Sequence, residues 1–572
     1  MKRVCSTNNS ELHEQNQHAS SIHPVKNKFV LMKNRSFLTS FSIILLFAFS
    51  CKNSTEGFRT ITPEVLKDKI AGGWAGKMIG VTYGAPTEFR AKSRIYEDSI
   101  TWKPADITGS MWQDDIYVQL TFLMSMDKYG IDAPSKKYQE MFAKAGYPLW
   151  HANMQARKNY YDSIFAPLSG TPEYNLHADD IDFQIEADYI GFMCPGMPQT
   201  ASQIADKIGR IMNYGDGVYG GIFVAALYSE AYFESDRMKV IEKALQSIPA
   251  ESDYYKIVKD VIKLYAYYPS DWKKTWKELE DKWGDVDICG DGAGTDFNID
   301  AKLNGAYIVM GLLYGEGDPA KTLEITTRCG QDSDCNPSNA LAVLGVMKGF
   351  TGLPENMQAG VKSMGDSLFI NTTYSFNTAV SSTEKYALDL IVKDGGTVTE
   401  KKIMVKTQLP LAPKNEVSFP DVVFDKRVSV FEENGWKFSG KWKPFEVTSN
   451  RDNKLIKQSF YSENAGDELE ISFSGTGISI DGNWYKDGGK ADIYVDGNLH
   501  RTIDTYYNFA NQQHTESIWH ILNLKPGDHK IRLVVKGEKR PESAGNRVYI
   551  TSAVIFKTAP KKNENFKFSF EK

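Results

Sequence analysis

Apolar residues follow two different patterns in two successive parts of the chain. Up to about residue 392, apolar runs have the length and spacing of helices that bury one face, and Gly and Pro residues separate them. This pattern predicts helices at 115–126, 201–212, 220–233, 238–245, 254–267, 303–313 and 338–349. The first part is therefore predicted to be a compact all-α domain.

The helical domain is expected to cover residues 60–395. Thr62-Pro63-Glu64 marks its start, because a hydroxyl side chain can cap a helix, Pro suits the first helical position and an acid lies near the positive end. After residue 395, the segment 397–407 looks like a strand, and 408–416 contains two prolines and no periodicity. We therefore expect a linker at 396–416.

Beyond the linker, apolar residues alternate with other residues, as in strands with one buried face. The alternation includes 469–473, 478–480, 493–495 and 531–535, and such segments are separated by turns at Asp481-Gly482, Asp496-Gly497 and Pro526-Gly527. Short strands at these intervals predict a jelly-roll-like β-sandwich at 417–558. The fold class is accordingly multidomain, with an all-α domain followed by an all-β sandwich.

The N-terminal segment has the layout of an export signal. Lys33 and Arg35 precede an apolar stretch at 37–49, which is too short to span a bilayer comfortably, and Ser50-Cys51 follows. This order resembles a bacterial lipoprotein signal, whose cysteine receives the lipid; an ordinary signal peptide cut nearby is the alternative. We expect residues 1–51 to be the signal region, with Met32 as the true start of the protein. The mature protein is expected to be exported and lipid-anchored at Cys51 to a bacterial membrane, at the periplasmic side or the cell surface.

Composition and charge exclude some partners. The 572 residues are 41% hydrophobic and 12% aromatic, with a formal net charge of −5. The chain therefore has ample core material and no basic field that would attract nucleic acid. The four cysteines after the signal region either form disulfides in an oxidising compartment or are small buried packing residues.

Two acidic clusters, Gln113-Asp114-Asp115 and Asp332-Ser333-Asp334, each lie beside a helix-like apolar run. Four carboxylates that meet in one place repel each other unless a cation neutralises them. Carboxylates without nearby histidines favour hard cations such as Mg²⁺ or Mn²⁺. The pattern predicts a divalent-metal site, unless each pair simply caps its own helix.

Three motifs in register carry a resemblance to a known family. They are Gly76-Lys77-Met78-Ile79-Gly80 with Pro86-Thr87-Glu88, then Gln113-Asp114-Asp115, and then Gly330-Gln331-Asp332-Ser333-Asp334-Cys335. In order and spacing, residues 60–350 resemble the ADP-ribosylglycohydrolase family, which includes the dinitrogenase reductase-activating glycohydrolase. The resemblance implies an all-α fold with one or two Mg²⁺ or Mn²⁺ ions. The implied metal ligands are Asp114, Asp115, Asp332, Asp334 and Gln113, and the implied catalytic residues are Glu88, Asp115 and Asp332.

The chain departs from the family pattern at three positions. Gln113 and Cys335 replace hydroxyl residues beside the two acid pairs, and a thiol is a poor ligand for a hard cation. Lys77 stands where the family has an acid, so it is expected to lower the pKa of nearby carboxylates or to pair with an anionic substrate. With these departures, the resemblance does not fix ADP-ribose as the substrate.

Other polar residues are weaker candidates. Tyr214-Gly215-Asp216-Gly217 opens an apolar helix and resembles the family's substrate loop, although close helix packing also explains the glycines. With Lys77, these residues are the candidate substrate-binding groups. Further acids at 179–182, 186 and 188 are expected on a solvated face, and His151 and His177 are expected to have no role.

Three functions are consistent with the sequence. The first is a divalent-metal-dependent glycohydrolase that cleaves an N- or O-glycosidic bond of an extracytoplasmic glycan-derived or ribosyl substrate. The second is an ADP-ribosyl-protein hydrolase, and the third is a non-catalytic sugar-binding lipoprotein. The sandwich resembles galactose-binding-like modules, and aromatic residues such as Trp484 and Trp519 are able to face sugars, although most are expected in the core. The expected partners are a carbohydrate or ADP-ribose-like small molecule and the membrane.

Overall fold

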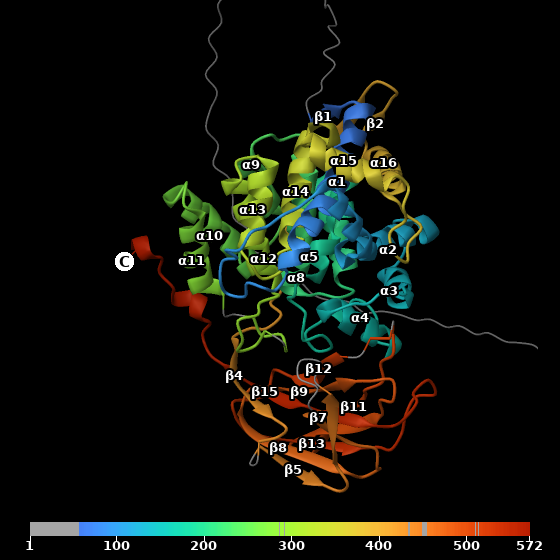
Figure 1. The fold of residues 1–572 in the computed structure, drawn as a ribbon, viewed down its shortest axis with the longest axis vertical. Helices are drawn as coiled ribbons and strands as arrows, with labels where there is room; N and C mark the ends of the chain where they lie inside the picture. The colour runs from blue at the N-terminus through green and yellow to red at the C-terminus, as the bar shows by residue number, and fades with distance from the viewer. Residues whose placement is uncertain are drawn as a thin grey trace, which may run out of the picture. The chain divides into compact units, whose positions relative to one another are not determined.

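A computed structural model describes residues 57–571, apart from 285–286, 291, 433–434, 449–454, 510 and 513. The predicted signal region, with Met32 and Cys51, lies outside the described residues. The described chain consists of a helical domain followed by a region of antiparallel sheets (Figure 1), as the sequence predicts. None of its helices combines the length and the hydropathy that a bilayer crossing needs.

Each helix predicted from the sequence is present. The helices are α1 (Pro63–Gly84), α2 (Asp114–Tyr129), α3 (Ser135–Lys144), α4 (His151–Tyr161), α5 (Asp182–Glu186), α6 (Asp188–Phe192), α7 (Pro198–Gly209), α8 (Gly215–Ala231), α9 (Arg237–Ala244), α10 (Asp253–Tyr267), α11 (Trp272–Trp283), α12 (Ala301–Tyr314), α13 (Pro319–Arg328), α14 (Cys335–Lys348), α15 (Glu355–Met364) and α16 (Phe376–Lys393). The predicted cap is confirmed, because the Thr62 hydroxyl accepts a hydrogen bond from the backbone N–H of Val65 at 3.3 Å.

A stripe of glycines allows α1 to touch α14 backbone to backbone. A Cβ atom on Gly76 would lie 2.5 Å from the carbonyl oxygen of Leu341, and one on Gly80 would lie 2.4 Å from that of Pro337. No side chain fits at such distances, so these two positions require glycine. The contact places the end of α1 beside the loop that precedes α14, where the second acidic cluster lies.

The β region begins after the linker. The predicted alternation is present on β8, whereas β9 is buried at all its positions and continues through Asp481-Gly482, where the sequence pattern predicted a turn. Its strands are β4 (Val422–Ser429), β5 (Trp436–Ser439), β6 (Lys443–Thr448), β7 (Leu455–Ser462), β8 (Glu468–Gly475), β9 (Gly477–Trp484), β10 (Lys490–Val495), β11 (Asn498–Asp504), β12 (His514–Ile521), β13 (Gly527–Val535), β14 (Val548–Ile550) and β15 (Ser552–Thr558). They form sheets with the orders β11-β10-β13-β8-β5, β12-β9-β15-β4 and β14-β7-β6. On β8, Leu469, Ile471 and Phe473 are buried, as the alternation predicts.

The expected linker is partly structured. Strand β1 (Phe58–Ile61) pairs antiparallel with β3 (Ile403–Lys406), which in turn pairs with β2 (Thr397–Val398). The helical domain is therefore closed by a small sheet that joins its first residues to a segment after its last helix. The sequence pattern gave β2 and β3 as one strand and did not predict β1, because a partner distant in sequence leaves no local signal.

Specific hydrogen bonds join the sandwich to the helical domain. The side chain of Gln512 accepts from the N–H of Leu149 at 3.1 Å and donates to its carbonyl at 2.6 Å, and His520 Nε2 lies 2.7 Å from the carbonyl oxygen of Pro172. After the last strand, the chain returns to the helices, where the Phe570 ring stacks on Tyr267 at 4.1 Å between centroids. The two domains thus contact each other through specific hydrogen bonds and a ring stack.

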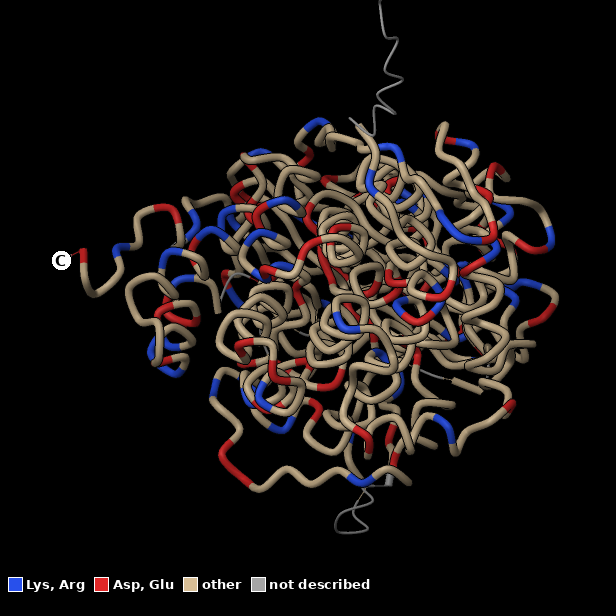
Figure 2. Tube along the Cα trace, turned by 90° about the horizontal axis from the view of Figure 1, so that it is seen from above, with Lys and Arg blue, Asp and Glu red and all other residues tan. Residues whose placement is uncertain are grey.

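Charged residues of both signs alternate over the described chain (Figure 2), and no large area of one sign is visible in this view.

We predict that Gly80→Ala destabilises the protein. Alanine in a helix gains about 1 kcal/mol in intrinsic propensity over glycine, but the added methyl group would meet the α14 backbone at 2.4 Å. Overpacking of this kind costs about 1–3 kcal/mol or more, so the midpoint of urea unfolding should fall. Gly290→Ala is the control, since nothing lies within 4 Å of its added Cβ. A Gly80→Ala protein as stable as the parent would contradict the close contact.

Candidate metal and active site

The two acidic clusters meet in space with Glu88. Ligand atoms of Glu88, Asp332 and Asp334 lie within 4.8 Å of one another, and so do those of Asp115, Asp334 and Cys335. These residues come from the loop after α1, the first turn of α2 and the segment that leads into α14. The arrangement brings three segments together that are far apart in the sequence.

Local hydrogen bonds fix the segment that carries the second cluster. Gln331 adopts a left-handed backbone conformation with φ 54°, and its side chain accepts from the N–H of Asn298 and donates to the carbonyl of Asp296. The Ser333 hydroxyl lies 2.7 Å from that of Thr87. Because Thr87 directly precedes Glu88, this contact holds the loop of Glu88 against the aspartates.

The first cluster lies at the N-terminus of α2. Gln113 is the residue before the helix, and Asp114 and Asp115 are its first two residues, where the exposed N–H groups favour negative charge. Asp115 is fully buried, whereas Asp114 and Gln113 are partly exposed. The N-terminus of α2 therefore stabilises the negative charge of both carboxylates, and Asp114 is the one that solvent reaches in part.

Lys77 is completely buried and neutralises Asp115. Its ammonium lies 3.0 Å from Asp115 Oδ1 and 3.1 Å from Asp188 Oδ2, and it donates to the carbonyl of Ile185 at 2.8 Å. Burial alone lowers the pKa of Lys77, but the two carboxylates outweigh this effect and raise it above the ordinary value. In this position the ammonium is an internal ion-pair partner and does not face the surface.

Cys335 also interacts with Asp115. Its thiol donates to Asp115 Oδ2 at 3.1 Å, and burial raises the pKa of the thiol above its ordinary value. A protonated thiol is a donor and a weak ligand. Both carboxylate oxygens of Asp115 are thus already engaged, one by Lys77 and one by Cys335.

Among the described residues, Asp114, Glu88 and Asp332 have no basic side chain that offsets their negative charge in the way that Lys77 offsets that of Asp115. Burial, together with the neighbouring acids, raises the pKa of Asp114 to about 7 and that of Glu88 to about 9. The pKa of Asp332 rises to about 7, mainly through burial and with a contribution from Glu88. The Oδ1 atom of Asp332 is buried and has no hydrogen-bond partner among the described residues. A divalent cation held by Asp332 and Asp334, with Glu88 and Asp114 beside it, would offset the repulsion among these groups, and oxygen ligands of this kind suit Mg²⁺ or Mn²⁺.

The acids at 179–188 correct the expectation of a solvated face. Asp182, Glu186 and Asp188 are buried. Asp182 accepts from the backbone N–H groups of Ala152 and Asn153 at 3.3 and 2.9 Å, so it caps the N-terminus of α4. These acids lie behind the site and belong to its supporting network. The helical spacing of Asp182 and Glu186 fits a buried face as well as an exposed one, and only the fold decides between them.

His177 has partners, contrary to the expectation, whereas Nδ1 of His151 lies 3.9 Å from Asp180 Oδ2 and has no hydrogen-bond partner among the described residues. His177 Nδ1 lies 2.7 Å from Asp180 Oδ2, and Nε2 lies 3.2 Å from Oε2 of Glu516 on β12. Burial lowers the pKa of His177, but both carboxylates outweigh it and raise the pKa well above 6.5. Ligand atoms of His151, His177 and Asp180 lie within 4.8 Å of one another, as do those of Asp180, Asp287 and Cys289. The spacing of His177 and Asp180 was a visible signal, but Glu516 belongs to another domain.

The glycine-rich segment lies in a different environment. Gly215 begins α8, and a Cβ on it would lie 2.6 Å from the Ser418 hydroxyl oxygen; one on Gly217 would lie 2.4 Å from the carbonyl oxygen of Ala178. Burial raises the pKa of Asp216 to about 8; the charge of Asp179 also raises this pKa, and that of Lys302 lowers it. Tyr214, its N-cap residue, is partly buried. The structure does not bring this segment together with the acids of the metal site, and close packing explains its glycines.

None of the four cysteines among the described residues forms a disulfide, and all four are buried. This agrees with the packing alternative. In the sandwich, Trp484 and Trp519 are also buried, as expected for most of its aromatic residues.

Comparison with known proteins identifies the helical domain. Residues 62–379 match the family model described as ADP-ribosylglycohydrolase. The chain belongs to the ADP-ribosylglycohydrolase family, whose members are hydrolytic and generally metal-dependent. Comparison with curated proteins gives no match.

Comparison with solved structures gives matches to parts of the chain. A structure titled "ADP-ribosylglycohydrolase-related protein complex" is 12% identical and covers 57% of this chain and 98% of its own, with a TM-score of 0.41. The CBM36-1 domain of a multidomain xylanase from the hindgut metagenome of Trinervitermes trinervoides is 16% identical over 24% of this chain and 98% of its own, with a TM-score of 0.16. A family 35 carbohydrate binding module from an environmental isolate is 15% identical over the same shares, with a TM-score of 0.17.

The raised carboxyl pKa values predict how pH and cations affect stability. Asp114 and Asp332 titrate near 7 in the folded state, above the ordinary 3.8, so the folded protein binds more protons than the unfolded chain. Cation-free protein should therefore lose stability as the pH rises from about 4 through 7. Because a bound cation offsets the repulsion, Mg²⁺ should raise the melting temperature more at pH 8 than at pH 5. Scanning fluorimetry in EDTA and in excess Mg²⁺ measures this, and an equal or absent shift at both pH values would contradict it.

Proposed function

We propose that the protein is a divalent-metal-dependent glycohydrolase that cleaves an N- or O-glycosidic bond. Family membership supports glycoside hydrolysis, and the observation that carries the metal dependence is the convergence of Glu88, Asp332 and Asp334 with an unpartnered buried oxygen. A bound divalent cation would orient sugar hydroxyls and make a coordinated water more acidic.

The side chains around the proposed cation position are suited to different steps of hydrolysis. Asp332 and Asp334 are buried and hold their places through the segment before α14, so they are suited to bind the cation and to accept a proton from the attacking water. Glu88 is exposed at the edge of the cluster, close to the Asp332 and Asp334 carboxylates, where a leaving group can reach its carboxyl group. It is therefore the group that is suited to protonate the leaving group.

Lys77 has a supporting role in this proposal. Since its ammonium pairs with Asp115 and Asp188 inside the protein, it supplies one fixed positive charge to the cluster. We infer that this charge reduces the demand for cations, so that one divalent ion is enough. The thiol of Cys335 supports the same inference, because it occupies the second oxygen of Asp115.

A glycan-derived substrate is favoured over ADP-ribose. The predicted lipoprotein signal would place the enzyme outside the cytoplasm, at the periplasmic or cell-surface side of a bacterial membrane, and the predicted β-sandwich also favours a glycan-derived substrate. Removal of ADP-ribose from proteins is the second candidate, and membership of the family supports it.

We predict that hydrolysis depends on the cation and on Asp332. Purified protein is incubated with a panel of aryl glycosides and with ADP-ribosylarginine, in Mg²⁺ or Mn²⁺ and in EDTA. Turnover of a glycoside should disappear in EDTA, return with the metal, and be absent in Asp332→Asn. Asp389→Asn, at an exposed acid on α16, is the control and should retain activity. Turnover that survives EDTA would refute metal dependence, and turnover of ADP-ribosylarginine alone would establish the second candidate.

A second prediction concerns Glu88. Glu88→Gln should lower kcat by about two to four powers of ten, because a general acid contributes about that much. The loss should be large for a glycoside with a poor leaving group and small for one with a good leaving group, which needs no protonation. Glu97→Gln, at an exposed acid paired with Lys273, is the matched control. An equal loss for all leaving groups would show that Glu88 is not the proton donor.

A further inference from the structure

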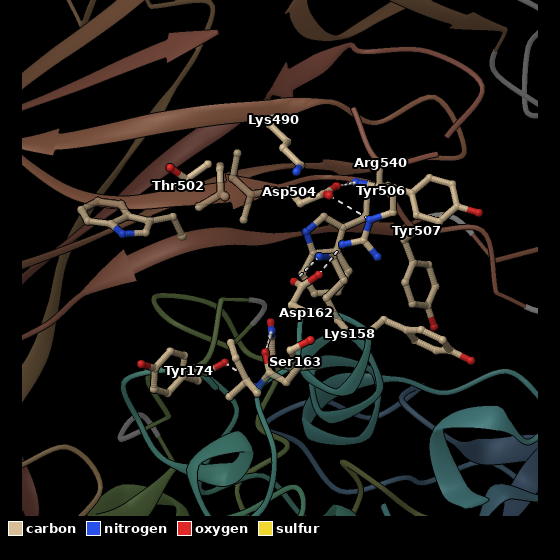
Figure 3. A pocket seen from close by; sticks show the side chains of 18 of the residues that line it. Lys158, Asp162, Ser163, Tyr174, Lys490, Thr502, Asp504, Tyr506, Tyr507 and Arg540 are labelled. Carbon is tan, nitrogen blue, oxygen red and sulfur yellow. Dashed lines mark hydrogen bonds and ion pairs between the residues drawn. The ribbon is translucent and has the colours of Figure 1, made fainter. Parts of the chain in front are cut away.

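A pocket of about 810 Å³ lies between α4 and the sandwich (Figure 3). One wall comes from the end of α4 and the residues after it, including Lys158 and Asp162, and the other comes from β9 to β12 and the residues near Arg540. Its volume is within the range of cavities that enclose a small-molecule ligand, about 300–1,000 Å³. Because both domains contribute, the pocket exists only in the assembled chain.

Ion pairs fix the two walls relative to each other. Arg540 binds Asp504 on the sandwich side, with Nε 2.8 Å from Oδ2, and it also binds Asp162 on the helical side. Arg501 lies over the Tyr174 ring at 4.5 Å from the centroid and pairs with Glu173 at 3.1 Å. These links make the pocket a preformed cavity, which reduces the ordering cost of ligand binding.

The lining has both the polar groups and the rings that a sugar needs. Four cations and three anions line the pocket, so it has little net charge, and the accessible rings of Tyr161, Tyr506 and Phe509 provide aromatic surface. A strongly anionic ligand would meet carboxylates, and a purely apolar one would leave the ion pairs unsolvated. Sugars combine hydroxyl groups with apolar ring faces, which aromatic side chains bind.

Lys490 is the group that marks the pocket for a ligand. Three of the lining cations are in ion pairs with acids, but the Lys490 ammonium has no ion-pair or hydrogen-bond partner among the described residues. In Figure 3 its side chain extends from the start of β10 toward the space between the walls. An ammonium in this position offers three hydrogen-bond donors to hydroxyl or ring oxygens.

The pocket is connected to the candidate active site through α4. The N-terminus of this helix binds Asp182 behind the metal site, through the N–H groups of Ala152 and Asn153, and Asp162 directly after it lines the pocket. At 1.5 Å per residue, these two points are about 15 Å apart along the helix axis. The helix therefore joins the wall of the pocket to the buried network beside the acidic site.

We propose that this interdomain pocket binds an uncharged oligosaccharide segment of the substrate, away from the bond that is cleaved. The proposal rests on the proposed glycohydrolase function for the identity of the substrate. It assigns to the sandwich the role of completing a subsite with the helical domain, and Lys490 is its specific contact.

The test uses the full mature chain with Asp332→Asn, which prevents turnover during binding. The probes are an array of immobilised oligosaccharides of defined structure, followed by calorimetry with the best soluble one, and ADP-ribose. Lys490→Ala should weaken oligosaccharide binding at least tenfold. Lys437→Ala, at an exposed strand lysine of β5 outside the pocket, is the matched control and should change binding less than twofold.

The possible results separate this proposal from the proposed function. Binding that depends on Lys490 supports the subsite even if the parent protein turns over no glycoside, in which case the proposed function fails alone. An array without any bound oligosaccharide, or binding that Lys490→Ala leaves unchanged, would overturn the subsite. Binding of ADP-ribose that requires Lys490 would overturn it as well, because the pocket would then select a charged nucleotide.

Discussion

Repulsion among buried carboxylates is the constraint on which the site depends. Asp332 and Asp334 are buried and lie close to Glu88, which is exposed at the edge of the cluster, so the charges of the two aspartates are tolerated only with protons or a cation nearby. The buried ammonium of Lys77 lies beside the cluster, and it is already paired with Asp115 and Asp188. The remaining acids are therefore held in a geometry that favours an external divalent ion, and the glycine contact between α1 and α14 fixes that geometry.

The same constraint explains the departures from the family motifs. A lysine in place of an acid at position 77 would be costly in a site built for two cations, because like charges would meet at short distance. Here, the lysine and the thiol of Cys335 engage both oxygens of Asp115. The changes at positions 77 and 335 are consistent with each other, since both act on one carboxylate and leave Asp332 Oδ1 without a hydrogen-bond partner among the described residues.

Much of this arrangement could be predicted from the sequence, because its signals lie within short segments of the chain. Helix and strand periods gave the two domains, the Thr62 cap gave the start of α1, and motif order indicated which aspartates would meet. Apart from the meeting of these aspartates, contacts between segments that are distant in the sequence could not be predicted. The pairing of β1 with β3, the burial of Asp182 and the link from His177 to Glu516 all depend on which segments pack together, and no pattern within either partner encodes that choice.

The interface between the domains gives the sandwich a part in the architecture of the site. Gln512, His520 and Glu516 all bond to segments of the helical domain, so the sandwich is held in one orientation. The most direct test of the account is crystallography with Mn²⁺, using anomalous scattering to locate the ion. The account predicts one strong peak within ligand distance of the Asp332 and Asp334 carboxylates. No peak there, or a peak only at a distant surface group, would contradict it.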